Sequence, residues 1–590
     1  MPDNQRKEGK QESEQTVERR QLLQTVGAGI GGLSLVGIGS DTVTAAESGC
    51  ARGPFEATAE VGTVNVGQIR ADQARGKTPP TMGAASPRTT ARDDSGQPPK
   101  RTAHDPHAEP GGSLSILTEY DGVNSLETRG GVPSDSQVAA GNGKIVHALN
   151  QQIAIYNKRA GRRQRLFRLE RLWEPVIPEP PGGFAYGYPF VFDPRARYDR
   201  NADRFILCAT QYEPGLTTSG ELIEREDLEE AAMEDEPVAE AKISRPPRGW
   251  FVVAVSATSN PNGQWYVYRI PPVDASGIDN TGLVDYPTLG FDRDAVYLSQ
   301  NFFGQTKFEV TMATLDKSAM YAGEDVTTRH FDEMNDPDGP FTFTVQPAQQ
   351  AYSGGEDGAF YMVNAGFDSD ELTLWEVTDP TDDPSLDCFT IDASPYASPP
   401  PARQPESSSL IDTLGTRLMN ADYSDGSLWT AHSTAVDWNG NGRPVAAIQW
   451  FEIDAASRSV VQSGLYGEPG KSYFIPTIRT NGEATVIAHN VSGPDTFPRM
   501  DVAGRTADYT DGELEDSVIV EEGKSKYDAL PGEVERWGDY NGVSIDPSSG
   551  RFWTVSQYSP DIDVPVDQPE RDPYFTRIAE VSFEDGSGHE

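Results

Sequence analysis

The sequence has little cysteine, and that shortage excludes two classes of protein. Its 590 residues contain 3 cysteines, and no CxxC pair occurs among them. Neither a disulfide scaffold nor a structural zinc site is therefore expected. Cys208 ends the apolar run Phe205–Cys208 and is expected to be a small buried hydrophobic residue. A Cys208–Cys388 bridge is the alternative.

Lysine is also scarce, and acid dominates the charge. Of the 49 basic residues 12 are lysine, and 91 acidic residues give a net charge of −42. A duplex nucleic-acid partner is excluded, because binding phosphates requires basic residues to neutralise them. The acidic residues occur along the whole chain, including the strand-like segments. We interpret them as an adaptation to high salt, where the repulsion between like charges is screened.

The chain lacks an apolar run long enough to span a bilayer, so no membrane span is expected. Its first apolar run, Val26–Ile38, is short and rich in glycine and follows the pair Arg19-Arg20. This pattern is typical of a twin-arginine signal, which exports folded proteins. Residues 1–46 are predicted to be this signal peptide, and the mature protein is expected to be secreted or held at the cell surface. Lipid attachment at Cys50 is an alternative that the preceding residues do not favour.

Composition divides the remaining chain into a tether and one folded unit. Residues 47–112 are rich in Pro, Ala, Thr and Gly with few aromatics, which predicts a disordered linker. Residues 113–590 form the predicted fold. Within it, residues 215–248 are strongly acidic and are interpreted as a solvated insertion between two strands.

One pattern recurs through the folded unit. A polar residue opens a short strand, a turn follows, and a second apolar strand ends in Asn, Gln or His. The seven strand ends are Asn150, Gln211, Gln300, Asn364, His432, His489 and Gln557. Short, repeated strands rich in β-branched and aromatic residues predict an all-β fold. Several strands per repeat favour a single β-propeller with seven blades, six being the alternative.

The last third of the sequence carries specific strings. These are Arg536-Trp-Gly-Asp-Tyr540, Asp546-Pro547 and Phe552-Trp553. With them the chain resembles a family of secreted, largely uncharacterised, sialidase-like β-propeller proteins, over roughly residues 130 to 585. The resemblance implies the fold and export, and it implies no particular reaction. The sialidase box Ser-x-Asp-x-Gly-x-Thr-Trp is absent.

The spacing of the pattern places its polar residues together. Asp135 and Asn150, Asp285 and Gln300, and Arg417 and His432 are each fifteen residues apart. In a propeller, the strand openers and strand ends of this kind meet at one face around the axis. The predicted ligand-binding residues are Asp135, Asp285, Arg417, Arg536, Asp539, Gln300, His432, His489 and Gln557.

Mixed carboxylates and guanidiniums suit a sugar or another anionic ligand. Asp285 and Asp539 are the candidates for catalysis, because paired carboxylates can cleave a glycosidic bond. The competing interpretation is that these groups satisfy one another and close the channel.

No cofactor or metal is expected, although calcium is an alternative. Asp437–Gly442 resembles the start of a calcium loop, but Ile448 stands where the bidentate acid belongs. A hairpin turn is preferred there. The sequence favours a monomeric extracellular binding module for a glycan or protein partner. The alternative is a carbohydrate-active enzyme, a glycoside hydrolase or lyase of sialidase-like build, and the sequence does not decide between binding and catalysis.

Overall fold

The structure, a computed structural model, describes residues 49–69, 113–128, 131–178, 190–218, 222–223, 243–274, 276–278, 280–304, 308–337, 342–350, 358–529, 533–562 and 572–584. Strands dominate these ranges, and α3 (Lys317–Ala322) is the one α-helix within them. The all-β prediction is confirmed. The predicted signal peptide lies outside the described residues.

The first meander shows how the sequence builds each sheet. It comprises β4 (Gln137–Ala140), β5 (Lys144–Leu149), β6 (Gln152–Asn157) and β7 (Arg162–Arg168), paired antiparallel in that order. Gly143 permits the tight turn between β4 and β5 with φ +75°. Val146 and Ala148 pack into one core cluster, whereas Ile145 and Leu149 pack into another. Both faces of this sheet are therefore buried, which explains the nearly continuous apolar runs.

The same antiparallel meander of four strands recurs along the chain. The second meander comprises β8 (Phe190–Asp199), β9 (Arg204–Glu213), β13 (Arg248–Ser256) and β14 (Gln264–Ile270), and the third comprises β17 (Gly282–Phe291), β18 (Ala295–Gly304), β19 (Phe308–Asp316) and β20 (Thr327–Asp332). The fourth comprises β21 (Gln346–Gln349), β22 (Phe360–Ala365), β23 (Glu371–Thr378) and β24 (Ser385–Asp392), and the fifth comprises β26 (Ala421–Ser424), β27 (Ser427–Val436), β28 (Val445–Asp454) and β29 (Ser459–Tyr466). The sixth comprises β30 (Ser472–Thr480), β31 (Ala484–Gly493), β32 (Thr496–Thr506) and β33 (Glu515–Glu521).

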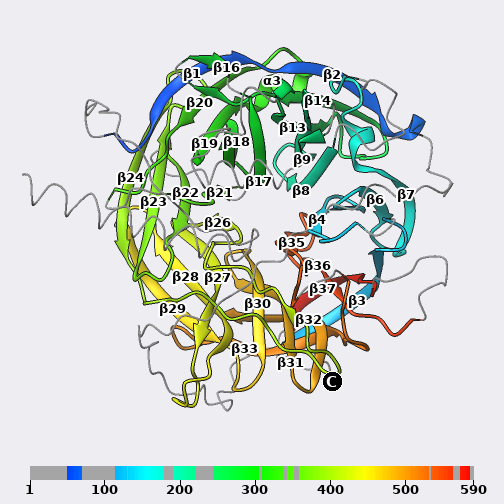
Figure 1. Cartoon of the computed structure of the whole chain (residues 1–590), viewed down its shortest axis with the longest axis vertical. Coiled ribbons are helices and arrows are strands. Elements are labelled where there is room, and N and C mark those ends of the chain that lie inside the picture. Colours follow the sequence, from blue (N-terminus) through cyan, green and yellow to red (C-terminus); the bar gives the residue numbers. More distant parts are fainter. Residues whose placement is uncertain are drawn as a thin grey trace, which may run out of the picture.

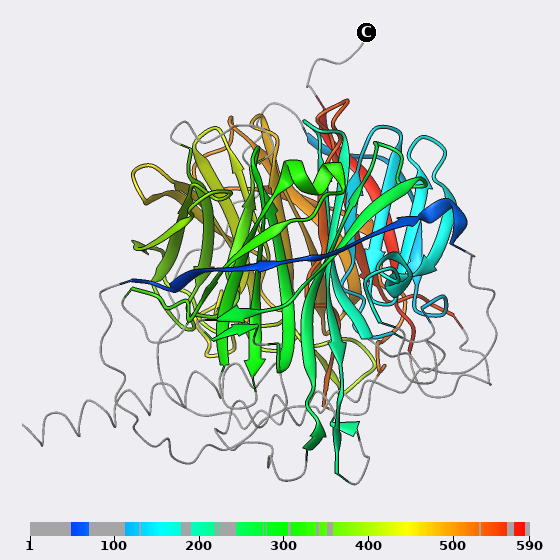
Figure 2. The ribbon, with the colours of Figure 1, turned by 90° about the horizontal axis from the view of Figure 1, so that it is seen from above.

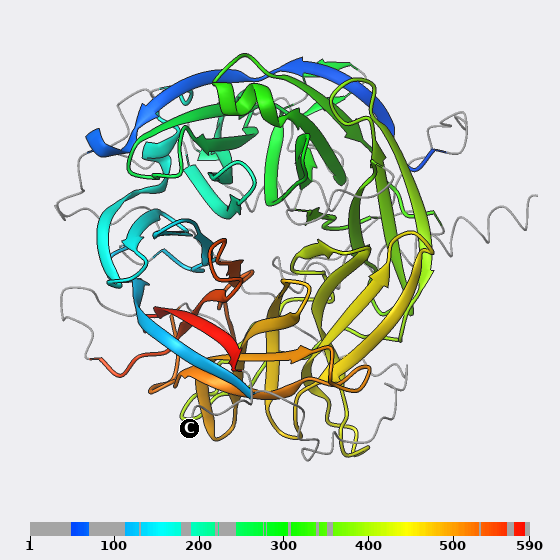
Figure 3. The ribbon, with the colours of Figure 1, turned by 180° about the vertical axis from the view of Figure 1, so that it is seen from behind.

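The last meander joins the two ends of the folded unit. β35 (Gly542–Ile545), β36 (Phe552–Tyr558) and β37 (Phe575–Glu584) pair in order, and β3 (Ser113–Asn124) adds antiparallel to β37. Figure 1 and, from behind, Figure 3 show β3 lying beside β37. Short parallel contacts of β21 with β17 and β26 join three meanders into a 13-stranded sheet. Within the described ranges no sheet closes on itself through backbone pairing.

The meanders follow one another around a common axis, with the first strand of each nearest to it (Figure 1). Side chains in or directly before these inner strands bond to the next inner strand around the axis. The bonds are Arg197 to Gln137 Oε1 (2.6 Å), Arg195 to Pro287 O (2.8 Å), Thr288 to Val345 O (2.9 Å), Gln346 to Leu418 O (2.7 Å), Asn420 to Ile478 O (2.7 Å), Asn541 to Ile475 O (2.7 Å) and Gln137 to Asn541 O (2.6 Å).

Residues 50–69 form an N-terminal strap along the outer edges of the sheets. Its strand β1 (Arg52–Thr58) pairs with β20, and β2 (Glu60–Asn65) pairs with β14. In Figure 1 the strap, drawn in blue, crosses the outer rim. The sequence assigned this stretch to the disordered linker, and that assignment is wrong for the strap. Its side chains are largely exposed, so edge pairing rather than a core of its own orders it.

The cysteine pairing also differs from expectation. Cys50 of the strap forms a disulfide with Cys388 on β24, with Cα atoms 6.0 Å apart. The sulfur of Cys50 is thereby engaged, and the alternative Cys208–Cys388 bridge is wrong. Cys208 is a free and fully buried thiol on β9, as expected of a small core residue.

The segment that the sequence analysis interprets as an acidic insertion lies between β9 and β13. Its ends form a small sheet of β10 (Gly215–Thr217), β11 (Leu222–Ile223) and β12 (Ile243–Arg245). This sheet extends beyond the ends of the neighbouring strands (Figure 2). Residues 224–242, which hold most of the acid, lie outside the described residues.

Candidate functional site

Two loops run side by side at the axis and bring distant charges together. β25 (Leu410–Ile411) pairs in parallel with β34 (Val534–Glu535). The pairing continues one residue further, where the backbone N–H of Asp412 donates to the carbonyl of Glu535 at 2.9 Å. Asp412 thus lies next to Arg536, although more than one hundred residues separate them in the sequence.

Arg536 links two carboxylates. It forms an ion pair with Asp539 and lies 3.8 Å, Nη1 to Oδ2, from Asp412. The side chains of Arg536 and Asp539 are 22% and 13% exposed, so part of the group reaches solvent. Burial raises the pKa of Asp412, and Arg536 opposes that rise. We call Asp135, Asp412, Arg536 and Asp539 the axial cluster.

Asp135 is the buried member of this cluster and has structural partners. Its Oδ1 accepts the backbone N–H of Asp539 at 2.6 Å, and its Oδ2 accepts the amide of Asn150 at 2.6 Å. Its side chain is fully buried. Burial, followed by the negative charges of Asp539 and Asp193, raises the pKa of Asp135 well above its usual range. Asp135 therefore positions the backbone at Asp539.

Aromatic rings line one side of the cluster. The hydroxyl of Tyr286 on β17 donates to the carbonyl of Asp539 at 3.1 Å. Because β17 and β35 belong to meanders that are not neighbours, this contact crosses the axis. The guanidinium of Arg417 lies 5.2 Å from the ring centroid of Tyr286 and 5.0 Å from that of Phe343. Arg417 and Asp539 thus share Tyr286 as a neighbour.

Three of the inner strands contain a similar bulge. In these bulges Asp193, Tyr286 and Ile475 have positive φ, and each precedes a proline. A side chain from the preceding meander accepts the backbone N–H of each: Asn150 for Asp193 (2.8 Å), Asp193 for Tyr286 (3.3 Å) and Ser433 for Ile475 (3.1 Å). Our sequence reasoning missed Asp193 and Asp412. The recurring X-Pro dipeptide could have indicated Asp193, but no local signal marks Asp412.

The other predicted residues differ in where they lie. A Cβ added to Gly538 would lie 3.7 Å from Oε1 of Gln557 and 3.9 Å from Oδ1 of Asp135, so Gln557 borders the cluster. Gln300 is buried and donates to Thr311 Oγ1 at 2.8 Å within its own sheet. Asp285 is buried directly before Tyr286 on β17. Its role beside Asp539 stays a prediction.

The two predicted histidines occupy separate surroundings. His432 packs against Tyr396 and Phe451, with ring centroids 4.7 and 5.6 Å away. His489 instead packs against Tyr466 and Tyr473 at 5.7 and 5.5 Å. Each ring therefore lies among its own aromatic neighbours. Both are fully buried.

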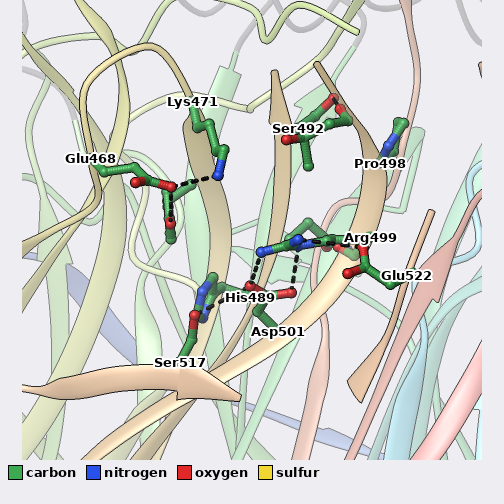
Figure 4. A network of polar contacts seen from close by, with 12 residues as sticks. Glu468, Lys471, His489, Ser492, Pro498, Arg499, Asp501, Ser517 and Glu522 are labelled. Atoms are coloured by element: carbon green, nitrogen blue, oxygen red, sulfur yellow. Dashed lines mark hydrogen bonds and ion pairs between the residues drawn. The ribbon is translucent and has the colours of Figure 1, made fainter. Parts of the chain in front are cut away.

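Figure 4 shows the polar network around His489. His489 pairs in register with Asp501 on the adjacent strand. Oδ2 of Asp501 accepts from Arg499 Nη2 at 2.9 Å and from Ser517 at 3.2 Å. Burial raises the pKa of Asp501 to about 6, and Arg499 opposes the rise. Because each charge here has a partner, the network holds the strands of this sheet together.

The described ranges contain no group of three or more His, Cys, Asp or Glu side chains arranged to hold a metal ion. In the turn between β27 and β28, the carboxylate of Asp437 accepts the N–H groups of Asn441 (3.1 Å) and Gly442 (2.7 Å).

No helix in the described part of the chain has the length and apolar character needed to cross a bilayer.

The axial cluster contains both signs of charge and lies beside the buried ring of Tyr286. Guanidinium groups can bind carboxylates through two hydrogen bonds, and carboxylates can accept hydroxyl groups. A few convergent polar groups beside apolar surface are typical of a ligand site. Arg536 pairs with both Asp412 and Asp539, and acid–base cleavage of a glycosidic bond uses two carboxyl groups.

No protein-family model matches the sequence, and no curated protein matches it. Similar solved structures include the WD40 repeats of RRP9 (9% identity, TM-score 0.34, covering 80% of this chain and 99% of that chain). The polysaccharide lyase Uly1 has 9% identity and a TM-score of 0.33, over 80% of this chain and 100% of that one. A Trypanosoma rangeli sialidase in complex with sialic acid has 10% identity and a TM-score of 0.33, over 69% and 56%. At TM-scores this low, these likenesses carry no argument about function.

Proposed function

We propose that this chain is an exported β-propeller that binds a glycan or protein partner outside the cell through its axial face. The observation that supports this proposal most directly is the position of Arg536, which is partly exposed and lies between Asp412 and Asp539. Its guanidinium suits an acidic group of a sugar and its carboxylate neighbours can accept hydroxyl groups.

Closure of the fold into seven blades is part of this proposal. Seven four-stranded meanders occur among the described residues. Hydrogen bonds from side chains to the neighbouring inner strand connect all seven in a circle, as given above for Gln137, Arg195 and Asn541. The pairing of β3 with β37 supports closure, because it completes the last meander with a strand from the other end of the chain.

Export rests on two features. The pair Arg19-Arg20 precedes a short apolar run, which is the twin-arginine pattern. The Cys50–Cys388 disulfide suits an oxidising compartment, since disulfides are rare in the cytosol. The protein is then folded before it leaves the cell and works outside it as a monomer.

Binding is preferred over catalysis because of how the carboxylates are paired. Asp539 is engaged by Arg536 in an ion pair, so its carboxylate serves to hold the arginine that would contact the ligand. Asp135, whose pKa is raised most clearly, is fully buried and holds backbone. The alternative is a glycoside hydrolase or lyase. Asp412 favours this alternative, because its pKa is raised and Asp539 contributes to the rise. A raised pKa is what the proton donor of a catalytic carboxylate pair needs.

A combined glycan-array and hydrolysis screen of the folded full chain in molar salt tests this function. Wild type is expected to bind a subset of glycans without releasing sugar. Arg536→Gln should weaken that binding at least about tenfold, since about 1.4 kcal/mol is lost with one charged contact. The matched control is Arg458→Gln, which removes an arginine paired with Glu376 at an exposed position. Release of sugar would establish the enzyme instead, and equal binding by wild type and Arg536→Gln would refute the axial site.

A further inference from the structure

The first meander carries a charge opposite to that of the chain as a whole. Residues 136–169, which contain β4 to β7, have seven basic residues and no acidic one, although the net charge of the chain is −42. Six of the seven fall between residues 158 and 168, on β7 or in the turn before it. Because β7 is the outermost strand of its sheet, a basic surface is concentrated on one outer edge of an acidic protein.

Ion pairs within the chain neutralise only some of these cations. The pairs are Arg163 with Glu127, Lys158 with Asp546 and Arg168 with Glu170. Among the described residues Lys144, Arg159, Arg162 and Arg165 form no ion pair. Arg159 and Arg162 are exposed, and the other two are half-buried. We call these four residues the cationic edge.

Strand pairing places three members of the cationic edge on one face of the sheet. Asn157 of β6 pairs in register with Lys144 on one side and with Arg162 on the other, and directly paired residues share a face. Arg165 pairs with the residue two positions before Asn157, so it lies on the same face. Nζ of Lys144 donates to Oε1 of Gln164 at 2.5 Å, and the lysine thus reaches across to β7.

The outer side of β7 has no neighbouring strand within the described ranges, where it pairs with β6 alone. The outer edges of the second and third meanders are instead covered by the strap strands β2 and β1, and β3 completes the last meander. In Figure 1 β7 lies on the outer rim between β2 and β3. The rim of this fold therefore accepts added strands, and the edge of β7 can take one more.

Neither the linker nor edge protection explains the basic residues. Residues 70–112, which connect the strap to β3 and lie outside the described residues, contain seven basic and five acidic residues and seven prolines. Such a segment brings no excess of acid, and proline cannot donate to a sheet. Charge of either sign protects an exposed edge from aggregation, and β33, the last strand of its sheet, carries Glu515, Asp516 and Glu521. Protection alone thus needs no arginine on β7.

We propose that the outer edge of β7 binds an extended acidic segment of a partner polypeptide, which adds to the first meander as a fifth strand. The backbone of the partner would pair with the edge of β7, as β2 and β1 pair with the next two meanders. Its alternate acidic side chains would face Lys144, Arg162 and Arg165, since guanidinium groups bind carboxylates through two hydrogen bonds. A polysaccharide has no peptide groups to pair with a strand edge, so a polypeptide matches this surface better.

A fluorescently labelled synthetic peptide in which glutamate alternates with valine is the probe. Fluorescence anisotropy with the full chain, at the lowest salt concentration in which it remains folded, should show binding that weakens as salt is added. The double variant Arg162→Gln/Arg165→Gln should bind about tenfold more weakly, because two charged contacts are lost. The control is Arg293→Gln, which removes an arginine 82% exposed in another meander and should bind as wild type does.

Two further peptides separate charge from strand pairing. A glutamine version lacks the charge, and a version with methylated backbone nitrogens cannot donate to β7, so both should bind more weakly than the probe. Equal binding of either peptide, or no binding of the probe, would overturn the proposal. Heparin that binds more tightly than the probe, through the same arginines, would overturn it in favour of an anionic polysaccharide. Arg536→Gln should bind the probe as wild type does, so the result is independent of the axial site.

Discussion

At the scale of single residues, burial controls how the histidines titrate. His147, His330 and His432 are buried, and burial lowers the pKa of each to about 3. The pKa of His489 is lowered to about 4 by burial, which its hydrogen bond to Ile487 O partly opposes. The folded protein therefore holds these rings neutral, whereas the unfolded chain takes up protons near pH 6.5. Stability from these residues is fully present above pH 6.5 and falls as the pH drops towards 3.

His432→Phe should reduce this sensitivity to acid. A phenyl ring fits between Tyr396 and Phe451 and cannot take up a proton when the chain unfolds. Between pH 8 and pH 5 the variant should lose about 2 kcal/mol less unfolding free energy than wild type, at about 1.4 kcal/mol per pH unit below 6.5. Urea unfolding at both pH values measures the difference. An identical loss in both proteins would contradict the assignment of a neutral buried imidazole.

At the scale of elements, the N-terminal strap matters most. It covers the outer edges of β20 and β14, which would otherwise expose unpaired backbone groups. Arg52 binds the buried Asp332 of β20 through two hydrogen bonds of 3.2 and 2.7 Å. The disulfide from Cys50 to Cys388 attaches the strap to a third meander. One short segment thus connects separate meanders along their rim.

Cys388→Ser should release the start of the strap. The expected cost is about 2–4 kcal/mol of unfolding free energy, the usual contribution of a native disulfide. Thermal melts of wild type with and without reductant should show the same loss, and Cys388→Ser should no longer respond to reductant. Cys208→Ala serves as the control, because Cys208 is a free core thiol and its variant should keep the response. A wild type that melts identically in both conditions would show that the strap contributes no stability through this bond.

At the scale of the whole molecule, charge is the leading property. The net charge of −42 produces self-repulsion that weakens the compact state at low ionic strength. The screening length falls from about 10 Å at 0.1 M salt to about 3 Å at 1 M. With this many acidic residues, neighbouring surface carboxylates lie within about 10 Å of one another in any compact fold, so salt that screens their repulsion should stabilise the folded state.

Transfer from molar salt to dilute buffer should therefore lower the melting temperature. Molar glutamate and molar chloride should both prevent most of the loss, because screening depends on ionic strength. A difference between them at equal ionic strength reports an effect of the anion itself, through binding to the protein or exclusion from its surface. Differential scanning fluorimetry over a salt series measures both effects. A melting temperature that stays constant across the series would argue against adaptation to high salt.

Much of the local structure could be read from the sequence. Alternation, turn residues and apolar runs predicted strands that end close to Asn150, His432 and Gln557, and the structure has strands there. The ion pair of Arg536 with Asp539 was also predictable, because three residues separate them in one motif. These features depend on short-range sterics and on which face of a strand is apolar. Neighbours in the sequence carry that information.

Other features were decided by tertiary structure alone. The strap looked like a linker because its strands β1 and β2 bury little and are ordered by pairing with distant edges. Asp412 meets Arg536 only through the parallel pairing of β25 with β34. Such contacts join segments far apart in the chain, and the packing of the whole set of sheets offsets the loop-closure entropy of bringing them together.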